Sequence, residues 1–347
     1  MPILLHVDDL KPGLRLAQAV YQRDRRLLSG GQQLDQWHID ALRRRFPDLL
    51  VRVLDPILDS MVEFEDDSQN TEVAAAVTTR MGRMMGSVQT KVGRRTALDG
   101  SDLAGLQYAL KDVMEYLESH PVTAAVLLHS EGKTSYLQEH AANVMYLSLL
   151  VGNAIRDYVY SERARTTHAR TLTVRYSLNL TPLALGCLFH DLGMLEIEEL
   201  IDQTDPLTDK QRDQLRYHPI VGASMLPDEI DAVTRMVVRT HHENVNGTGY
   251  PLGIPRSKLH VFSRIVRVAD AYDAATSERV YRRAKPASQV LWEITKGPLR
   301  NCYDPLIARI LSGLVQPFPI GAKIKLNCGR WGVVARHNRK SPFRPTI

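Results

Sequence analysis

Residues 183–191 read LALGCLFHD, an apolar run that ends in an adjacent histidine and aspartate. The apolar residues of this run follow helical spacing. Neighbouring side chains on a regular helix point about 100° apart, so His190 and Asp191 can serve one site only at a helix end or between two metal ions. The stretch therefore predicts an apolar helix whose C-terminal end presents two polar side chains.

The chain on both sides of this helix has a helical pattern as well. From about Leu103 to Leu314 apolar residues recur with helical spacing, and prolines lie near the expected helix boundaries. The basic, hydroxyl-rich stretch 158–179 is interpreted as a loop or a helix extension. We expect helices over residues 102–119, 135–157, 181–191, 208–225, 228–242, 259–276, 287–296 and 304–315.

The two ends of the chain differ in character from this helical region. Residues 1–56 combine strand-like segments at 14–21 and 49–54 with a helical pattern at 34–46, and the C-terminal end offers two short strands around Gly329. Residues 57–75 read as a linker or the start of a long helix, and residues 76–99 as a connecting helix or a mobile segment. We therefore expect a mainly α fold with four parts: a small α/β N-terminal regulatory or docking domain (1–60), a linker or connecting helix (61–100), a helical domain (101–315) and a short β appendage (316–347).

The composition argues against several classes of protein. Of the 347 residues, 44% are hydrophobic and 24% are charged, which is ordinary for a soluble globular protein. The three cysteines are far apart and form no CxxC pair, so neither a disulfide framework nor a thiolate zinc site is expected. The N-terminus lacks a signal-peptide pattern, and no apolar run approaches the ~18 residues of a membrane span. We expect a cytoplasmic protein with no membrane span and no DNA partner.

Further histidines and aspartates accompany the His-Asp pair. Imidazole and carboxylate ligands together suit divalent transition metals such as iron, manganese and zinc. A single helical histidine is more often a surface or core residue, and two aspartates one turn apart usually form a solvated face. The metal hypothesis therefore depends on the whole set, which comprises His140, His218 before Pro219, the pair His241-His242 before Glu243, and Asp270 with Asp273 one turn later on the same face.

Four motifs contain most of these residues, and together they are highly specific. In chain order they read HDLGMLEI at 190–197, LRYHPIVGASML at 215–226, HHENVNGTGYP at 241–251 and RIVRVADAYDAATSERVYRRAKP at 264–286. Their order and spacing resemble the HD-GYP family of the HD superfamily of metal-dependent phosphohydrolases, from His140 into the 280s. The resemblance implies a helical HD-superfamily bundle for residues 101–315. It also implies hydrolysis of the second messenger cyclic di-GMP, with the linear dinucleotide as product and GMP as the alternative end product.

The resemblance further implies a two-ion site. One ion would take His140, His190, Asp191 and Asp270; the second would share Asp191 and add His218, His241 and His242. A water or hydroxide between the ions would be the nucleophile, which makes the bridging Asp191 the expected catalytic residue. Some family members hold a third metal through a glutamate where this chain has Tyr136. We therefore expect two ions, iron or manganese, with zinc, magnesium or nickel as alternatives.

Substrate contacts are also implied by the resemblance. The loop Gly249-Tyr250-Pro251 would border the ligand, with Tyr250 offering a ring to a base or a hydroxyl to a phosphate. Arg279, Arg282 and Lys285 would bind phosphate, since guanidinium groups match phosphate oxygens. Without the resemblance, a structured turn and a solvated basic helix end are the simpler interpretations. The loop and the N-terminal domain are candidate contacts for a partner protein, and a homodimer is a candidate assembly.

One departure from the family pattern bears on activity. The family motif HDxGK ends in lysine, whereas this chain has Met194. Losing one charge-stabilising contact costs ~10²–10³ in rate unless Arg282 or Lys285 replaces it. A catalytically weak or inactive cyclic di-GMP-binding effector that signals through a partner is therefore the alternative to a phosphodiesterase. A third hypothesis is an HD-type phosphohydrolase acting on another nucleotide, against which the GYP loop argues.

Overall fold

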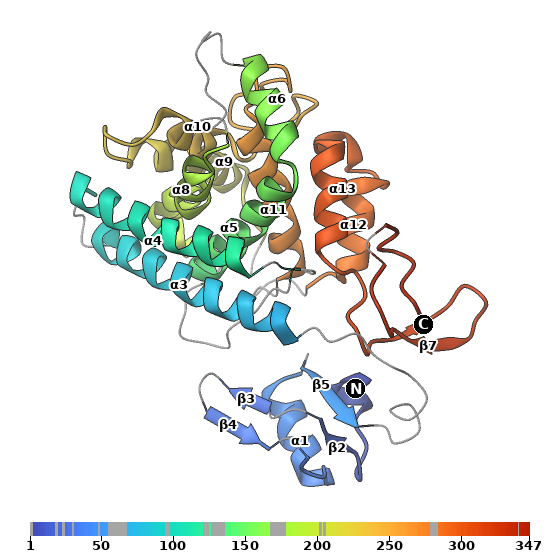
Figure 1. Cartoon of the computed structure of the whole chain (residues 1–347). Coiled ribbons are helices and arrows are strands. Elements are labelled where there is room, and N and C mark those ends of the chain that lie inside the picture. The colour runs from blue at the N-terminus through green and yellow to red at the C-terminus, as the bar shows by residue number, and fades with distance from the viewer. Residues whose placement is uncertain are drawn as a thin grey trace. The chain divides into compact units, whose positions relative to one another are not determined.

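Most of the residues that the structure describes are helical in the computed structural model, which confirms the expected mainly α fold (Figure 1). The structure describes residues 3–17, 20–22, 25–29, 31–47, 49–54, 68–93, 98–120, 122, 125, 136–166, 178–200, 203, 206–277, 284–338 and 340–347. Residues 1–68 together with 316–347 make one compact unit, and residues 69–315 make the other. The four-part division expected from the sequence stays a prediction.

The smaller unit has a three-stranded antiparallel sheet in the order β1 (Ile3–His6), β5 (Leu50–Leu54), β2 (Arg15–Leu16). Val51 and Val53 of β5 are two residues apart, so their side chains point to the same face of the sheet. There they are buried together with Leu16 and Ile39. Its remaining N-terminal elements are η1 (Val7–Asp9), the hairpin of β3 (Val20–Gln22) with β4 (Arg25–Leu28), and α1 (Gln36–Arg45).

The C-terminal segment belongs to this smaller unit. The expected strands are β6 (Lys323–Lys325) and β7 (Trp331–Val333), which pair antiparallel. Gly329 between them has φ +81°, a left-handed conformation that favours glycine. The backbone N–H of Leu4 donates to the carbonyl of Gly321 at 2.8 Å, so the two ends of the chain are joined by a hydrogen bond.

The larger unit contains the expected helices within a few residues of their predicted bounds. The helical pattern of 135–157 divides at Ile155, and residues 167–177 of the stretch 158–179 lie outside the described residues. The elements are α3 (Ser68–Gly93), α4 (Gly100–Ser119), α5 (Tyr136–Ala154), α6 (Arg156–Thr166), α8 (Thr181–Phe189), η2 (Leu192–Leu200), α9 (Asp209–Ser224), α10 (Ala232–Thr240), α11 (Val261–Thr276), α12 (Ala287–Thr295), η3 (Arg300–Cys302) and α13 (Pro305–Leu314).

Three helices at the centre of this unit position the site. Residues 140–149 of α5 and 182–189 of α8 are all buried, and α5 packs against both α8 and α11 (Figure 1). A helix that is apolar on every side is stable only inside a protein. α10 packs closely on α8 because Gly186 has no side chain: a Cβ there would lie 2.5 Å from Val237 Cγ1. The polar residues of these central helices are therefore held on a rigid framework.

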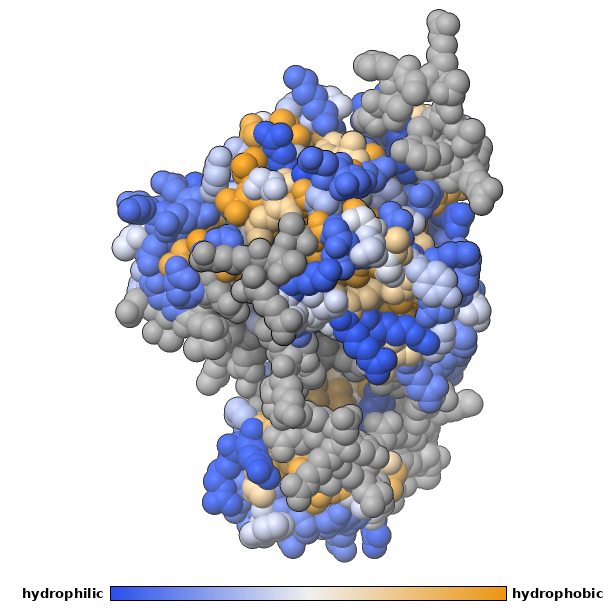
Figure 2. Space-filling model, turned by 90° about the vertical axis from the view of Figure 1, so that its left-hand side faces the viewer, coloured by the Kyte–Doolittle hydropathy of each residue, from blue (hydrophilic) through white to orange (hydrophobic). Residues whose placement is uncertain are grey.

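Apolar side chains are mostly inside. On the face shown in Figure 2, hydrophilic residues cover much of the described surface and hydrophobic ones show in patches between them. Among the described helices, none combines the length and the apolar character that crossing a membrane requires.

Candidate metal centre

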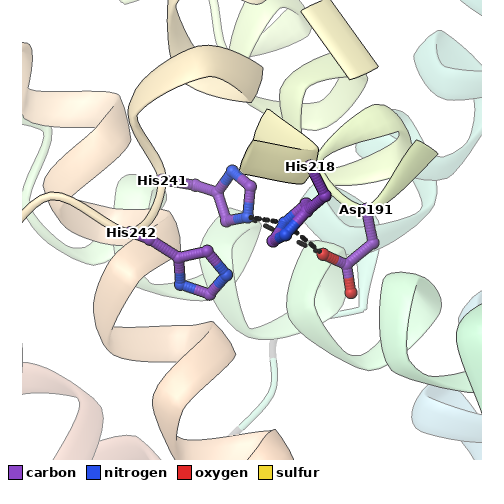
Figure 3. Close-up of side chains that lie close together, drawn as sticks. All are labelled: Asp191, His218, His241 and His242. Atoms are coloured by element: carbon purple, nitrogen blue, oxygen red, sulfur yellow. Dashed lines mark hydrogen bonds and ion pairs between the residues drawn. The ribbon is translucent and has the colours of Figure 1, made fainter. Parts of the chain in front are cut away.

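The structure brings together all seven predicted metal ligands, from five separate segments. Two groups of donor atoms form, each with its atoms within 4.8 Å of one another, and Asp191 belongs to both. One group is Asp191, His218, His241 and His242 (Figure 3), and the other is His140, His190 and Asp191. Asp270 completes the set, since its Oδ1 lies 3.2 Å from His140 Nε2 and its Oδ2 lies 3.4 Å from His242 Nδ1.

The backbone fixes the tautomer of three of these histidines. The Nδ1 atoms of His190, His218 and His241 lie 2.7, 2.6 and 2.8 Å from the carbonyl oxygens of Cys187, Leu215 and Val238 respectively. A carbonyl oxygen only accepts hydrogen bonds, so each Nδ1 donates. A neutral imidazole then presents the lone pair of its Nε2 to the cluster, which is the form that binds metal ions.

The arrangement of these lone pairs suits the binding of metal ions. Nε2 of His218 and Nε2 of His241 lie 3.2 Å apart, which places two acceptors against each other. Nε2 of His190 is buried and has no hydrogen-bond partner among the residues that the structure describes. A buried polar atom without a partner costs about 1–3 kcal/mol. Divalent cations would remove both problems, so the donor set fits the ions that the sequence predicted.

The two carboxylate oxygens of Asp191 face different groups of histidines. Its Oδ1 lies 3.2 Å from His218 Nε2, and its Oδ2 lies 3.5 Å from His190 Nε2. Burial favours the protonated acid, but the imidazoles around it, His190 first, hold the pKa of Asp191 well below its usual range. Burial lowers the pKa of His190 to about 4, which keeps that ring neutral near pH 7. One ionised oxygen thus faces each group of histidines.

Asp273 supports the site from behind, a role that the sequence analysis did not assign. Its Oδ2 lies 2.7 Å from Nδ1 of His140, and its Oδ1 accepts from Asn143 Nδ2 at 2.9 Å. Metal-binding histidines commonly donate their second N–H to a carboxylate, which orients the ring. The one-turn spacing from Asp270 was the signal in the sequence, but the partner of Asp273 lies on α5, far away along the chain.

The GYP loop is anchored beside the histidine pair. The buried Glu243 accepts the backbone N–H groups of Leu252 and Gly253 through Oε1 at 2.6 and 3.1 Å. Gly249 passes so close to the chain that a Cβ there would lie 2.2 Å from the backbone nitrogen of Asn244. The ring of Tyr250 lies 4.6 Å from that of His242, centroid to centroid. Burial raises the pKa of Tyr250, so its hydroxyl stays protonated and can donate.

Of the three predicted phosphate-binding residues, the structure describes Lys285. Arg279 and Arg282 lie outside the described residues. Nζ of Lys285 is 2.9 Å from Oε2 of Glu293, so its charge is paired. The backbone N–H of Met194 donates to the carbonyl of Asp191 at 2.9 Å, and its side chain is half-buried. The substrate roles of all these residues stay predictions.

Known families and proteins match this part of the chain. The HD domain family matches residues 151–307, which include six of the predicted ligands and begin after His140. A cyclic di-GMP phosphodiesterase of Pseudomonas aeruginosa is 32% identical over 166 residues, which is 47% of this chain and 40% of that protein. A cyclic di-GMP phosphodiesterase of Vibrio cholerae is 28% identical over 158 residues, 42% of this chain and 32% of that protein. The larger unit of this chain is thus similar to HD domains, and the matched relatives are named as cyclic di-GMP phosphodiesterases.

Not every relative of this chain is named for the same nucleotide. The 3′3′-cGAMP-specific phosphodiesterase 3 of Vibrio cholerae is 30% identical over 126 residues, 35% of this chain and 27% of that protein. In all three comparisons the matched stretch spans less than half of the relative. These relatives are thus phosphodiesterases named for two different cyclic dinucleotides.

Proposed function

We propose that this protein is a member of the HD-GYP family and hydrolyses a 3′–5′ phosphodiester bond of cyclic di-GMP, giving the linear dinucleotide and then GMP. The observation that carries the proposal is Asp191, which directs one carboxylate oxygen toward each of two histidine groups. That arrangement suits two ions a few ångströms apart, which can hold the attacking and leaving oxygens of a phosphoryl transfer.

The residues of the chain prepare the site for an anion. When bound, two divalent ions supply a deprotonated water near neutral pH and neutralise charge on the phosphate. Imidazole binds a metal ion in its neutral form and adds no charge, so the carboxylates of Asp191 and Asp270 would offset only part of the charge of such ions. Burial favours the protonated acid, but the neighbouring imidazoles, His242 first, hold the pKa of Asp270 below its usual range, so both carboxylates stay ionised. The result is a net positive, water-poor site for a phosphodiester.

The names of the relatives and the position of the loop support the choice of substrate. Two of the relatives are named for cyclic di-GMP and one for 3′3′-cGAMP, and both nucleotides contain guanine. The half-buried ring of Tyr250 lies against His242 at the edge of the cluster, where a guanine base could stack on it. Iron or manganese is the expected metal, since the donor set consists of imidazole nitrogens and carboxylate oxygens.

The first prediction is that the protein, purified without oxygen and loaded with Fe²⁺ or Mn²⁺, converts cyclic di-GMP faster than 3′3′-cGAMP. Asp191→Ala should lower that rate by more than about 10²-fold, because the bridging carboxylate is lost. Chromatography of the nucleotides over time measures it. The matched control is Asp228→Ala, which removes an exposed carboxylate from a loop and should leave the rate unchanged.

The binding effector is the second candidate, because Met194 replaces the family lysine. Metal-loaded protein that binds cyclic di-GMP without hydrolysing it, and that gains turnover in Met194→Lys, would establish the effector and reject the enzyme. Turnover of 3′3′-cGAMP alone would reject the substrate and keep the reaction type.

A further inference from the structure

A positively charged side chain to which the sequence analysis assigned no role lies at the edge of the metal cluster. Arg267 is on α11, one turn before Asp270, and its Nη1 lies 3.9 Å from Asp270 Oδ2. The same carboxylate oxygen lies 3.4 Å from His242 Nδ1. Arg267 therefore reaches the cluster on the side of His242, where the GYP loop passes.

Arg267 is held in place by two neighbours. Its Nε donates to Oδ1 of Asn244 at 3.1 Å, and its guanidinium carbon lies 4.9 Å from the centre of the Tyr303 ring. Asn244 is itself oriented, because its Nδ2 donates to Thr248 Oγ1 at 3.0 Å. A cation fixed in this way loses little conformational freedom when it binds an anion, which is what a binding or catalytic site requires.

Among the residues that the structure describes, no carboxylate lies as close to Arg267 as those that pair with its neighbours. Arg264, one turn earlier, is buried against Glu162 and Asp304, and Lys285 is paired with Glu293. Within the described residues, Arg267 forms an ion pair with Asp270 over a long distance of 3.9 Å. The oxygens of Asp270 also face His140 and His242. The bond to Asn244 uses only Nε, so the terminal nitrogens carry the other four N–H donors.

We propose that Arg267 is a catalytic residue that binds the substrate phosphate, an inference that rests on the proposed phosphodiester hydrolysis. Its side chain is 18% exposed, so it is accessible to a ligand yet largely shielded from solvent. A guanidinium group can bind two phosphate oxygens at once, and negative charge in phosphoryl transfer is spread over those oxygens. Arg267 thus supplies a fixed positive charge in a site whose motif has Met194 in place of lysine.

The test compares Arg267→Gln and Arg267→Lys with the wild type, using full-length protein loaded with Mn²⁺. Binding of inorganic phosphate is measured by calorimetry, metal content by elemental analysis, and kcat and KM with cyclic di-GMP. Arg267→Gln should weaken phosphate binding about 10- to 100-fold, the range of a charge-assisted hydrogen bond, and should keep its metal. It should lower kcat more than it changes KM, and Arg267→Lys should lie between the two. Arg309→Gln removes an exposed charge from α13 and should match the wild type.

Each result decides the role of Arg267. Unchanged phosphate affinity in Arg267→Gln overturns the proposal, as does a wild type that binds no phosphate. Loss of metal from either Arg267 variant also overturns it, because Arg267 would then only orient Asp270. If Arg267→Gln does not fold, the decision falls to Arg267→Lys, whose wild-type phosphate affinity would overturn the proposal. A wild type that binds phosphate through Arg267 but leaves cyclic di-GMP intact would reject the proposed substrate and retain the phosphate contact.

Discussion

Single side chains in the cluster depend on the groups behind them. His140 presents Nε2 to the site because its Nδ1 is held by Asp273 at 2.7 Å. Asp273→Asn would remove the negative charge that orients and strengthens this ligand, so we expect metal affinity to fall 10- to 100-fold. Competition with a chelator measures that affinity, and Asp228→Asn on the surface serves as the control. Unchanged affinity in Asp273→Asn would show that packing alone orients His140.

At the scale of an element, the start of α11 should make the protein sensitive to acid. Nδ1 of His260 caps this helix by accepting the N–H of Phe262 at 3.1 Å, and burial, with Arg163 and Arg264, lowers its pKa to about 3. In the unfolded chain, the imidazole of His260 has an ordinary pKa near 6.5 and binds a proton below that pH. In the folded protein the same ring stays neutral. Stability should therefore fall by about 1.4 kcal/mol per pH unit below about pH 6.5.

The variant His260→Asn isolates this effect, because asparagine also caps helices but does not titrate. Urea unfolding at pH 7.5 and at pH 5 gives the free energy of unfolding for both proteins. We expect the wild type to lose about 2 kcal/mol more than His260→Asn between these pH values. Equal losses would mean that the ring of His260 is protonated without cost in the folded protein.

At the scale of the larger unit, a buried charge network joins segments that are distant in sequence. Arg264 of α11 contacts Asp304 at the start of α13 at 2.7 Å, and Tyr158 of α6 donates to the same carboxylate at 2.7 Å. Asp304→Asn would keep the helix cap but leave Arg264 short of a negative partner, so we expect a loss of about 3–5 kcal/mol in unfolding free energy. Asp231→Asn is the matched control, because Asp231 caps α10 by accepting from Val233 N–H at 2.8 Å. This substitution should lower the unfolding free energy by less than about 1 kcal/mol. Equal stability of the two variants would show that Arg264 is satisfied without Asp304.

The sequence by itself determined the helices, the C-terminal hairpin and the identity of the clustered histidines and aspartates. Helical spacing, prolines, capping residues and turn glycines act over a few neighbouring residues, and the motifs have characteristic local spacing. The helix of residues 183–189 and the pair that follows it could therefore be predicted from that stretch alone.

Only the tertiary structure decided which side chains meet. The partner of His140 is Asp273 on another helix, Arg267 reaches Asn244 and Tyr303, and Leu4 bonds to Gly321. Gly193 shows the reason: a Cβ there would lie 2.2 Å from the carbonyl oxygen of His218, so η2 meets α9 only where no side chain intervenes. Contacts of this kind depend on how whole elements pack, and packing is decided by the fit of surfaces that no local pattern encodes.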